Sequence, residues 1–299
     1  MSEKIAFVFS GQGAQKQGMG KELCEKSKAA AEIFKMADEI RPGTSKQCFE
    51  APKEELDITV NTQPCLFTVD LAAAKALEEK GIKADAVLGF SLGEVAALGF
   101  AGVYTERESF EIVCKRAELM QKAAEENPGK MAAVLGISEE ALMEILSNFE
   151  CAEAVNFNCP GQISISFKEE DGEKIQEAVK AAGGKFRALA VSGAFHSGFM
   201  KQASLGLKEF LNNYKASKGN LPVYANLTAC PYPENSEDIK ENVALQVCSP
   251  VRWQKAIENA INDGITTFIE VGEGKVLCGL IRKINKDVKA LHYTEALEI

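Results

Sequence analysis

Short apolar runs alternate with longer amphipathic segments along this chain. Residues 4–9, 84–89 and 267–271 are mostly apolar runs of strand length, a pattern typical of strands buried on both faces of a parallel sheet. Helices are predicted over residues 20–40, 64–80, 92–102, 105–127, 197–214, 238–246 and 253–263, with a further strand over 221–226. Strands that alternate with helices predict an α/β fold with a mainly parallel sheet.

Residues 129–190 follow a different order of elements. Strands are predicted over residues 130–137, 152–158, 162–167 and 185–191, and helices over 138–149 and 168–182. The order β-α-β-β-α-β is typical of a ferredoxin-like domain. We therefore predict a hydrolase-like α/β catalytic domain, formed by residues 1–128 and 191–299, into which a ferredoxin-like subdomain of residues 129–190 is inserted.

The composition is that of an ordinary globular protein. Of 299 residues, 46% are hydrophobic and 26% are charged, and the net charge is −9. A negative net charge argues against nonspecific nucleic-acid binding. The longest apolar region, residues 86–104, contains Glu94 near its middle, which argues against a membrane span. The apolar run at residues 5–9 is shorter than the core of a secretory signal.

Cysteine usage bears on the compartment and on metal binding. The chain has nine cysteines, an odd number, and no two of them form a C-x-x-C pair. Scattered cysteines without a secretory signal are typical of reduced thiols in a cytoplasmic protein. With two histidines and no C-x-x-C pair, a zinc site is not expected. We therefore predict a cytoplasmic protein that needs no metal.

The strongest chemical signal is the segment Gly89-Phe90-Ser91-Leu92-Gly93. It has the form G-x-S-x-G, directly after a predicted strand and directly before a predicted helix, which is the context of a nucleophile elbow. The two glycines permit the sharp turn, and the helix N-terminus offers backbone N–H groups to a developing negative charge. A glycine-rich turn without chemistry is the alternative. The matched context favours Ser91 as a nucleophile.

A serine nucleophile needs a base, and the chain has two histidines. His196 lies in a loop of small residues between a predicted strand and a predicted helix, where site residues are common. His292 lies near the C-terminus, at a strand end or in a tail, so we predict His196 as the base. No acidic residue stands in a recognisable motif between Ser91 and His196, so the order Ser…Asp/Glu…His of α/β-hydrolases is not supported. A neutral group, or a backbone carbonyl, can orient the imidazole instead.

Two further polar residues are ambiguous from the residues alone. Gln12 lies in a turn between two glycines, which suggests phosphate binding, but the turn lacks both the Gly-Lys-Ser/Thr of a P-loop and a full G-x-G-x-x-G. Arg116 lies on the predicted helix 105–127, where most arginines are solvated surface charges.

Six segments, taken together in this order, carry a family resemblance. They are Ser10-Gly11-Gln12-Gly13-Ala14-Gln15, Gly89-Phe90-Ser91-Leu92-Gly93-Glu94, Arg116-Ala117-Glu118-Leu119-Met120-Gln121, Gly193-Ala194-Phe195-His196-Ser197, Gln246-Val247-Cys248-Ser249-Pro250-Val251-Arg252-Trp253 and Glu270-Val271-Gly272-Glu273-Gly274-Lys275-Val276-Leu277. The sequence resembles the malonyl-CoA:acyl carrier protein transacylases, the stand-alone acyltransferases of bacterial fatty-acid synthesis. The resemblance spans essentially the whole chain.

The resemblance implies roles for matching residues. Ser91 resembles the family's nucleophile and His196 its base. Gln12 and Leu92 resemble the residues whose backbone N–H groups form the oxyanion hole. Two such donors lower the energy of a tetrahedral transition state by a few kcal/mol each.

The resemblance also implies the substrate and the partner. Arg116 resembles the arginine that pairs with the malonyl carboxylate, a task that suits a planar guanidinium. Gln246 resembles the residue whose backbone carbonyl orients the histidine. The substrates implied are malonyl-CoA and acyl carrier protein, whose phosphopantetheine thiol accepts the malonyl group. The protein itself would need no cofactor.

Alternatives remain open from the sequence. An esterase or thioesterase would use the same elbow and pass the acyl group to water, and a polyketide-type acyltransferase would serve another pathway. In a carrier-docking protein without activity, Ser91 would have no catalytic role. One departure from the family stands beside the nucleophile, where Phe90 replaces the usual histidine.

Overall fold

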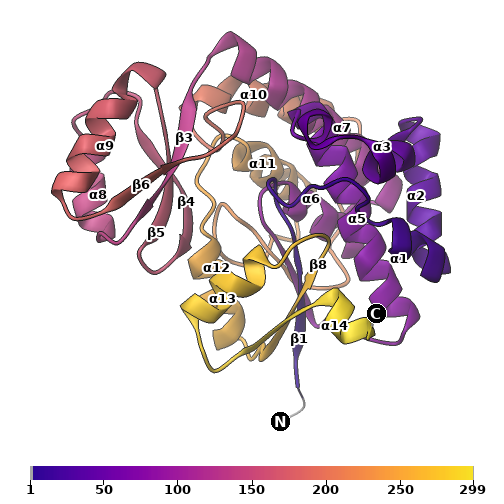
Figure 1. Cartoon of the computed structure of the whole chain (residues 1–299). Helices are drawn as coiled ribbons and strands as arrows, with labels where there is room; N and C mark the ends of the chain where they lie inside the picture. Colours follow the sequence, from indigo (N-terminus) through magenta and orange to yellow (C-terminus); the bar gives the residue numbers. More distant parts are fainter. Residues whose placement is uncertain (1–2, 299) are drawn as a thin grey trace.

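Two β-sheets organise the computed structural model, which describes residues 3–298 (Figure 1). The first sheet has the strand order β7-β2-β1-β8-β9, and every adjacent pair in it is parallel. Its strands are β1 (Ile5–Phe9), β2 (Ala86–Gly89), β7 (Val223–Tyr224), β8 (Thr267–Val271) and β9 (Lys289–His292).

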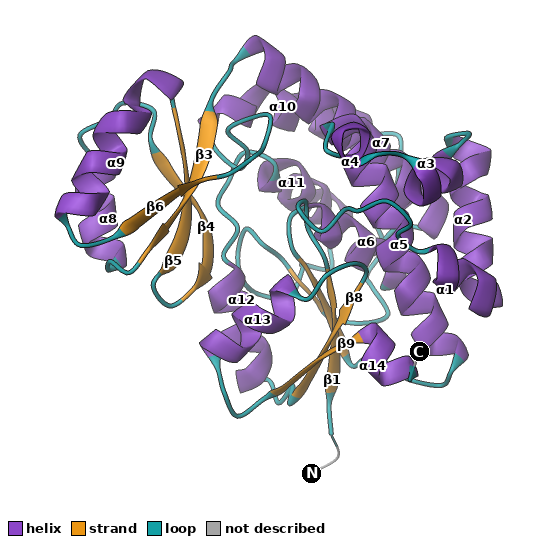
Figure 2. Ribbon diagram, viewed as in Figure 1, coloured by secondary structure: helices purple, strands orange, loops and turns teal. Residues whose placement is uncertain are grey.

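The second sheet is antiparallel and has the order β4-β5-β3-β6. Its strands are β3 (Lys130–Leu135), β4 (Glu153–Cys159), β5 (Gln162–Phe167) and β6 (Lys185–Ala188). Helices α8 and α9 cover the face of this sheet that points away from the parallel sheet (Figure 2). The predicted fold class, an α/β fold with a mainly parallel sheet, is confirmed, and a separate antiparallel sheet is formed by the residues that were expected to form a ferredoxin-like subdomain.

Helices pack against both faces of the parallel sheet (Figure 1). The α-helices are α1 (Lys21–Lys26), α2 (Lys28–Ile40), α3 (Thr44–Glu50), α4 (Lys53–Leu56), α5 (Thr59–Glu79), α6 (Leu92–Phe100), α7 (Glu106–Glu126), α8 (Glu139–Leu146), α9 (Gly172–Ala181), α10 (Lys201–Leu211), α11 (Ser236–Gln246), α12 (Trp253–Asn262), α13 (Val276–Ile284) and α14 (Tyr293–Leu297). Two 3₁₀ turns, η1 (Glu169–Asp171) and η2 (Gly198–Met200), precede α9 and α10.

The alternation of side chains along β1 divides the core into two layers. Phe7 and Phe9 point into the cluster that contains α2, α5, α6 and α7, whereas Ala6 and Val8 point into the cluster of α12 and α13. All four side chains are fully buried. A strand that is buried on both faces explains why the sequence of β1 is a continuous apolar run.

Several predicted boundaries differ from the structure. The predicted helix 20–40 is two helices, because Ser27 adopts an extended conformation and its hydroxyl caps α2 by accepting a hydrogen bond from the Ala30 N–H. Helix α5 begins at Thr59, so Pro64 lies inside the helix rather than at its start. Helices α3, α4, α13 and α14 and strand β9 were not predicted, and they complete the segments 44–56 and 276–297.

The register of the parallel sheet brings two loops together. Phe9 is paired with Gly89, and the N–H of Phe90 donates to the carbonyl of Phe9 at 3.0 Å. The loop after β1 and the turn after β2 therefore leave the sheet side by side at its carboxyl edge, where α/β proteins place their ligands. Among residues 3–298 no helix is long and apolar enough to cross a membrane.

Candidate active site

Ser91 occupies a sharp turn between β2 and α6. Its φ is 55° and its ψ is −109°, a strained conformation for a residue with a side chain. The turn is tight because the flanking glycines touch backbone: a Cβ on Gly89 would lie 2.0 Å from the carbonyl carbon of Gly93, and a Cβ on Gly93 would lie 2.4 Å from the carbonyl oxygen of Phe9. The two glycines are therefore a steric requirement of this turn.

His196 lies within hydrogen-bond distance of Ser91 although the two are 105 residues apart in the chain. The His196 Nε2 is 2.7 Å from the Ser91 Oγ, and the Nδ1 is 2.9 Å from the backbone oxygen of Gln246. A carbonyl oxygen can only accept, so Nδ1 carries the proton and Nε2 presents a lone pair to the serine hydroxyl. This pairing has the geometry that activates a serine hydroxyl.

Burial keeps the imidazole neutral. His196 is 3% exposed, and desolvation, with the positive charge of Arg116 as the next cause, lowers the pKa of His196 to about 4. The carbonyls of Gln246 and Ser249 oppose this shift by accepting hydrogen bonds. At neutral pH the ring is therefore a hydrogen-bond acceptor at Nε2.

Arg116 is buried beside the serine rather than solvated on the helix surface. It extends from α7, is 1% exposed, and its Nη2 donates to the Ser91 Oγ at 3.1 Å. The same Nη2 donates to the Gln246 Oε1 at 2.9 Å, and Nη1 donates to the Gln63 Oε1 at 2.6 Å.

The acceptors around this guanidinium are neutral. Desolvation lowers the pKa of Arg116 to about 10, so the group is positively charged at neutral pH. Its buried Nε has no hydrogen-bond partner among residues 3–298. A buried cation with neutral partners and an open donor can receive a carboxylate.

Leu92 directly follows the serine at the start of α6, and Gln12 lies in the loop after β1, which leaves the sheet beside the turn that carries Ser91. Leu92 is the first residue of α6, and its N–H has no hydrogen-bond acceptor in the described part of the chain. Gln12 follows β1, and its partly buried side chain forms no hydrogen bond to Ser91, His196 or Arg116.

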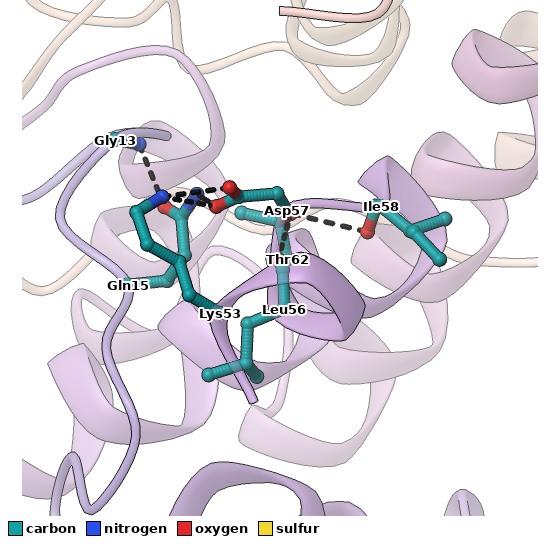
Figure 3. A network of polar contacts seen from close by, with 7 residues as sticks. All are labelled: Gly13, Gln15, Lys53, Leu56, Asp57, Ile58 and Thr62. Carbon is teal, nitrogen blue, oxygen red and sulfur yellow. Dashed lines mark hydrogen bonds and ion pairs between the residues drawn. The ribbon is translucent and has the colours of Figure 1, made fainter. Parts of the chain in front are cut away.

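The loop that carries Gln12 is anchored by a chain of polar contacts (Figure 3). The Gly13 N–H donates to the Gln15 Oε1 at 2.7 Å, and the Gln15 Nε2 donates to the Asp57 Oδ1 at 2.7 Å. Lys53 in α4 pairs with the same carboxylate at 2.7 Å. Helix α4 thereby fixes the backbone next to Gln12.

A cleft of about 230 Å³ lies in front of this loop. Gln12 and Phe90 line it from the carboxyl edge of the parallel sheet, and Asn156, Ser164 and Leu280 line it from β4, β5 and α13. The cleft thus runs between the two sheets. A larger hollow of about 770 Å³, beside Glu153 and Phe199, contains none of the six predicted site residues.

The sequence reasoning missed two residues that hold the site together. Gln63, in α5, binds the guanidinium of Arg116. Asn226, after β7, accepts a hydrogen bond from the Ser91 N–H at 2.9 Å. Both contacts are formed between distant parts of the chain, and the only sequence signal was a polar residue beside a proline or at a predicted strand end.

Phe90 occupies an apolar environment. Its ring packs edge-on against Trp253, with the ring centroids 5.4 Å apart, and its carbonyl and side chain contact the position where Gly11 would carry a Cβ. At the position where the resemblance implies a histidine, this chain therefore has a hydrophobic contact between the turn and α12.

Comparisons with known proteins give the family of this chain. Residues 6–292 match the family model of the acyl transferase domain. The malonyl CoA-acyl carrier protein transacylase of Bacillus subtilis is 42% identical over an alignment of 295 positions that covers 96% of this chain and 92% of that protein. The chain belongs to the malonyl CoA-acyl carrier protein transacylase family.

Solved structures of this family have the same fold. The transacylase from Clostridium perfringens superposes with a TM-score of 0.93 at 36% identity, covering 99% of this chain and 96% of that one. A malonyl-transacylase solved in complex with a type II polyketide acyl-carrier protein superposes with a TM-score of 0.94 at 31% identity, with 99% of each chain covered. The protein is therefore an acyltransferase.

The described residues offer no cluster of metal ligands. Within residues 3–298, no group of three or more His, Cys, Asp and Glu side chains is arranged to hold a metal ion.

Proposed function

We propose that this acyltransferase moves a malonyl group from malonyl-CoA to the phosphopantetheine thiol of acyl carrier protein, through an acyl-enzyme on Ser91. The observation that carries the proposal is the buried guanidinium of Arg116, whose Nη2 lies 3.1 Å from the Ser91 hydroxyl oxygen. In malonyl-CoA a single methylene separates the thioester carbonyl from the free carboxylate. A cation that binds this carboxylate must therefore lie next to the nucleophile.

In the first half-reaction, the Ser91 Oγ attacks the thioester carbonyl carbon while its proton moves to the His196 Nε2. The backbone N–H groups of Gln12 and Leu92 donate to the tetrahedral oxyanion. The carbon–sulfur bond then breaks, and the proton on His196 passes to the sulfur of coenzyme A. The malonyl ester remains on Ser91.

In the second half-reaction, the carrier's thiol gives its proton to His196 and attacks the ester carbonyl. The bond between Ser91 Oγ and the acyl carbon breaks, and the proton returns from His196 to the serine oxygen. The carbonyl of Gln246 holds the imidazole in the tautomer that both half-reactions require. We propose that the protein's own residues perform both steps without a bound cofactor, since the thioester supplies the activated acyl group.

We also propose a division of the chain into domains and a location in the cell. We propose that residues 129–190 are a subdomain inserted into a catalytic domain of residues 1–128 and 191–299. A hydrophobic cluster built entirely from residues within 129–190 supports this division. We also propose a cytoplasmic location, which is supported by nine cysteines that are all free thiols.

The test is intact mass measurement after incubation with a series of acyl-CoAs. A malonyl adduct that needs Ser91, persists in buffer and is discharged by carrier protein supports the transferase. Rapid loss of the adduct to water supports an esterase or thioesterase. No adduct, and unchanged behaviour of Ser91→Ala, supports a carrier-docking protein without activity. Carriers from fatty-acid and polyketide systems, compared as acceptors, identify the pathway.

A further inference from the structure

Asn226 lies in a tight loop directly behind the nucleophile turn. It is 1% exposed and follows β7. The loop is closed by two backbone hydrogen bonds, from the Ala229 N–H to the Ala225 oxygen at 2.8 Å and from the Ala225 N–H to the Cys230 oxygen at 2.9 Å. Ala229 has a φ of 60°, which is strained for a residue with a side chain. Strain of this kind is maintained where surrounding contacts over-determine the backbone.

The carboxamide of Asn226 contacts the nucleophile turn on both sides of Phe90. Its Oδ1 accepts from the Ser91 N–H at 2.9 Å, and its Nδ2 donates to the Gly89 oxygen at 2.7 Å. One planar side chain therefore binds the two peptide groups that flank Phe90 and fixes their relative orientation. The Nε2 of Gln246 adds a third contact, because it donates to the Ser91 oxygen at 2.8 Å and to the Asn226 Oδ1 at 3.2 Å.

These contacts decide which N–H groups of the turn remain open. The Gly93 N–H donates to the Phe90 oxygen at 3.0 Å, and the Glu94 N–H donates to the Ser91 oxygen at 3.1 Å. With the Ser91 N–H bound to Asn226, the N–H of Leu92 is the donor in this turn that has no acceptor within residues 3–298. The Asn226 carboxamide thus leaves a single backbone donor beside the Ser91 hydroxyl.

The backbone of Asn226 is itself held in place by a buried carboxyl group. Its N–H donates to the Glu94 Oε2 at 2.5 Å, and its oxygen accepts from the Arg252 N–H at 2.9 Å. Glu94 is 2% exposed, and its Oε1 accepts from the Tyr232 hydroxyl at 2.5 Å. The Glu94 side chain comes from α6, the helix that begins with the nucleophile turn, so the contacts form a closed ring.

We propose that Asn226 is a positioning residue for acyl transfer: its carboxamide holds Ser91 in the strained backbone conformation that aims Oγ at His196 and leaves the Leu92 N–H open. This inference rests on the proposed role of Ser91 as nucleophile. Without the carboxamide, the Ser91 N–H and the Gly89 oxygen lose their partners and the turn relaxes. Because a displacement of about 1 Å at a reacting group can cost roughly 100-fold in rate, we expect a loss of that order.

The experiment compares Asn226→Ala with a matched control, Asn259→Ala. Asn259 donates from Nδ2 to the Ala229 oxygen at 2.9 Å and to the Cys230 Sγ at 3.9 Å, so the control removes hydrogen bonds to the same loop without touching the turn. Two rates are measured, both normalised to the folded fraction: labelling of Ser91 by a neutral fluorophosphonate, and single-turnover acylation by malonyl-CoA. We expect both rates to fall about 100-fold in Asn226→Ala, with the Kd for malonyl-CoA changed less than about 3-fold, and neither rate to change in Asn259→Ala.

A purely structural role predicts a different result. If Asn226 only stabilises the fold, Asn226→Ala lowers the melting temperature while the folded protein is labelled at the wild-type rate. That outcome overturns the proposal. Should Asn226→Ala fail to fold, Asn226→Asp decides, because aspartate keeps the acceptor for the Ser91 N–H and removes the donor to the Gly89 oxygen. We expect slower labelling in Asn226→Asp, and a wild-type rate overturns the proposal.

The fluorophosphonate separates this inference from the proposed substrate. It reacts with an activated serine without needing the carboxylate site at Arg116. If wild-type protein is labelled but takes no malonyl group, the proposed function is wrong and the effect of Asn226 on labelling still tests the positioning role. If wild-type Ser91 is not labelled at all, both are wrong.

Discussion

The guanidinium of Arg116 and the imidazole of His196 meet at one atom, the hydroxyl oxygen of Ser91, at 3.1 Å and 2.7 Å. The arginine donates to this oxygen and the histidine accepts its proton. Arg116 is therefore close enough to bind a carboxylate in an acyl group that is attached to Ser91. After desolvation, the charge of Arg116 is the next cause that lowers the pKa of His196, so the two side chains are electrostatically coupled.

Removal of the Arg116 side chain should change substrate preference. In Arg116→Ala we expect malonyl transfer to fall about 100-fold or more, because a buried charge-assisted pair is lost, while acetyl transfer falls far less. The measurement is kcat/KM for malonyl-CoA and acetyl-CoA with the same carrier. Arg107→Ala is the control, since Arg107 lies on the same helix but is exposed and pairs with Glu39. Equal losses for both substrates would refute a carboxylate-binding role.

The pH dependence of serine reactivity should report the buried histidine. A base acts in its neutral form, and the pKa of His196 is lowered to about 4, so the labelling rate should stay constant from about pH 8 down to about pH 5 and fall below it. A solvated histidine would lose activity already near its ordinary pKa of about 6.5. His196→Ala should lose about 10³-fold or more. His292→Gln, at the other histidine of the chain, should retain the profile, and an acid limb near pH 6.5 would contradict the buried geometry.

Glu94 should make folding stability depend on pH. Burial raises its pKa from 4.5 to about 7, so the folded state favours the protonated form and stability is lost as pH rises from about 4.5 to 7. The shift corresponds to roughly 3 kcal/mol at most. The measurement is the free energy of unfolding in urea at pH 5 and at pH 8. The difference between these two free energies should be smaller in Glu94→Gln than in the wild type. Substitution of an exposed glutamate, Glu25→Gln, should leave this difference at its wild-type value. A wild-type pH dependence of stability in Glu94→Gln would contradict the raised pKa of Glu94.

The sequence predicted the sheet class because β1 and β2 are buried on both faces and carry continuous apolar runs. It also singled out Ser91, because G-x-S-x-G between a strand and a helix has few structural solutions. It did not predict that Ser27 would divide a helix, since a serine inside a helical pattern becomes a cap only when tertiary packing turns the chain. Short helices such as α4 carry too few residues for periodicity to be seen.

Asn226 and Gln63 were missed for a different reason. Each acts through hydrogen bonds to a residue more than 50 positions away, which no local pattern encodes. The polar contact between Arg116 and Ser91 joins residues 25 positions apart, which is also too far for a local pattern to encode. From the residues alone Arg116 was indistinguishable from a solvated helix arginine, and its burial follows from the packing of α7 against α5 and α6.

The Gln15 side chain, which anchors the Gln12 loop, should affect kcat rather than KM. In Gln15→Ala the Gly13 N–H loses its acceptor and the loop loses its link to Asp57, so the neighbouring Gln12 N–H is held less firmly. We expect kcat to fall about 10-fold with KM nearly unchanged, because in the proposed mechanism this N–H stabilises the transition state. Gln17→Ala is the control: Gln17 lies in the same loop, and its side chain donates to the Glu50 oxygen rather than to Gly13 or Asp57. A rise in KM at constant kcat would place the loop in ground-state binding instead.

Glycine-to-alanine substitutions in the turn and in a helix should have opposite effects on stability. A methyl group at Gly89 would lie 2.0 Å from the Gly93 carbonyl carbon and 2.1 Å from the Glu94 nitrogen, both backbone atoms that cannot move independently. We therefore expect Gly89→Ala to lose several kcal/mol of stability and all labelling of Ser91. Gly279→Ala is the matched test, because Gly279 lies within α13 and an added Cβ meets no atom within 4 Å. It should be neutral or gain about 0.5–1 kcal/mol, since alanine favours the helix. Comparable melting temperatures for the two variants would show that the turn can relax around an added methyl group, and the strain at Ser91 would then not be imposed by the glycines.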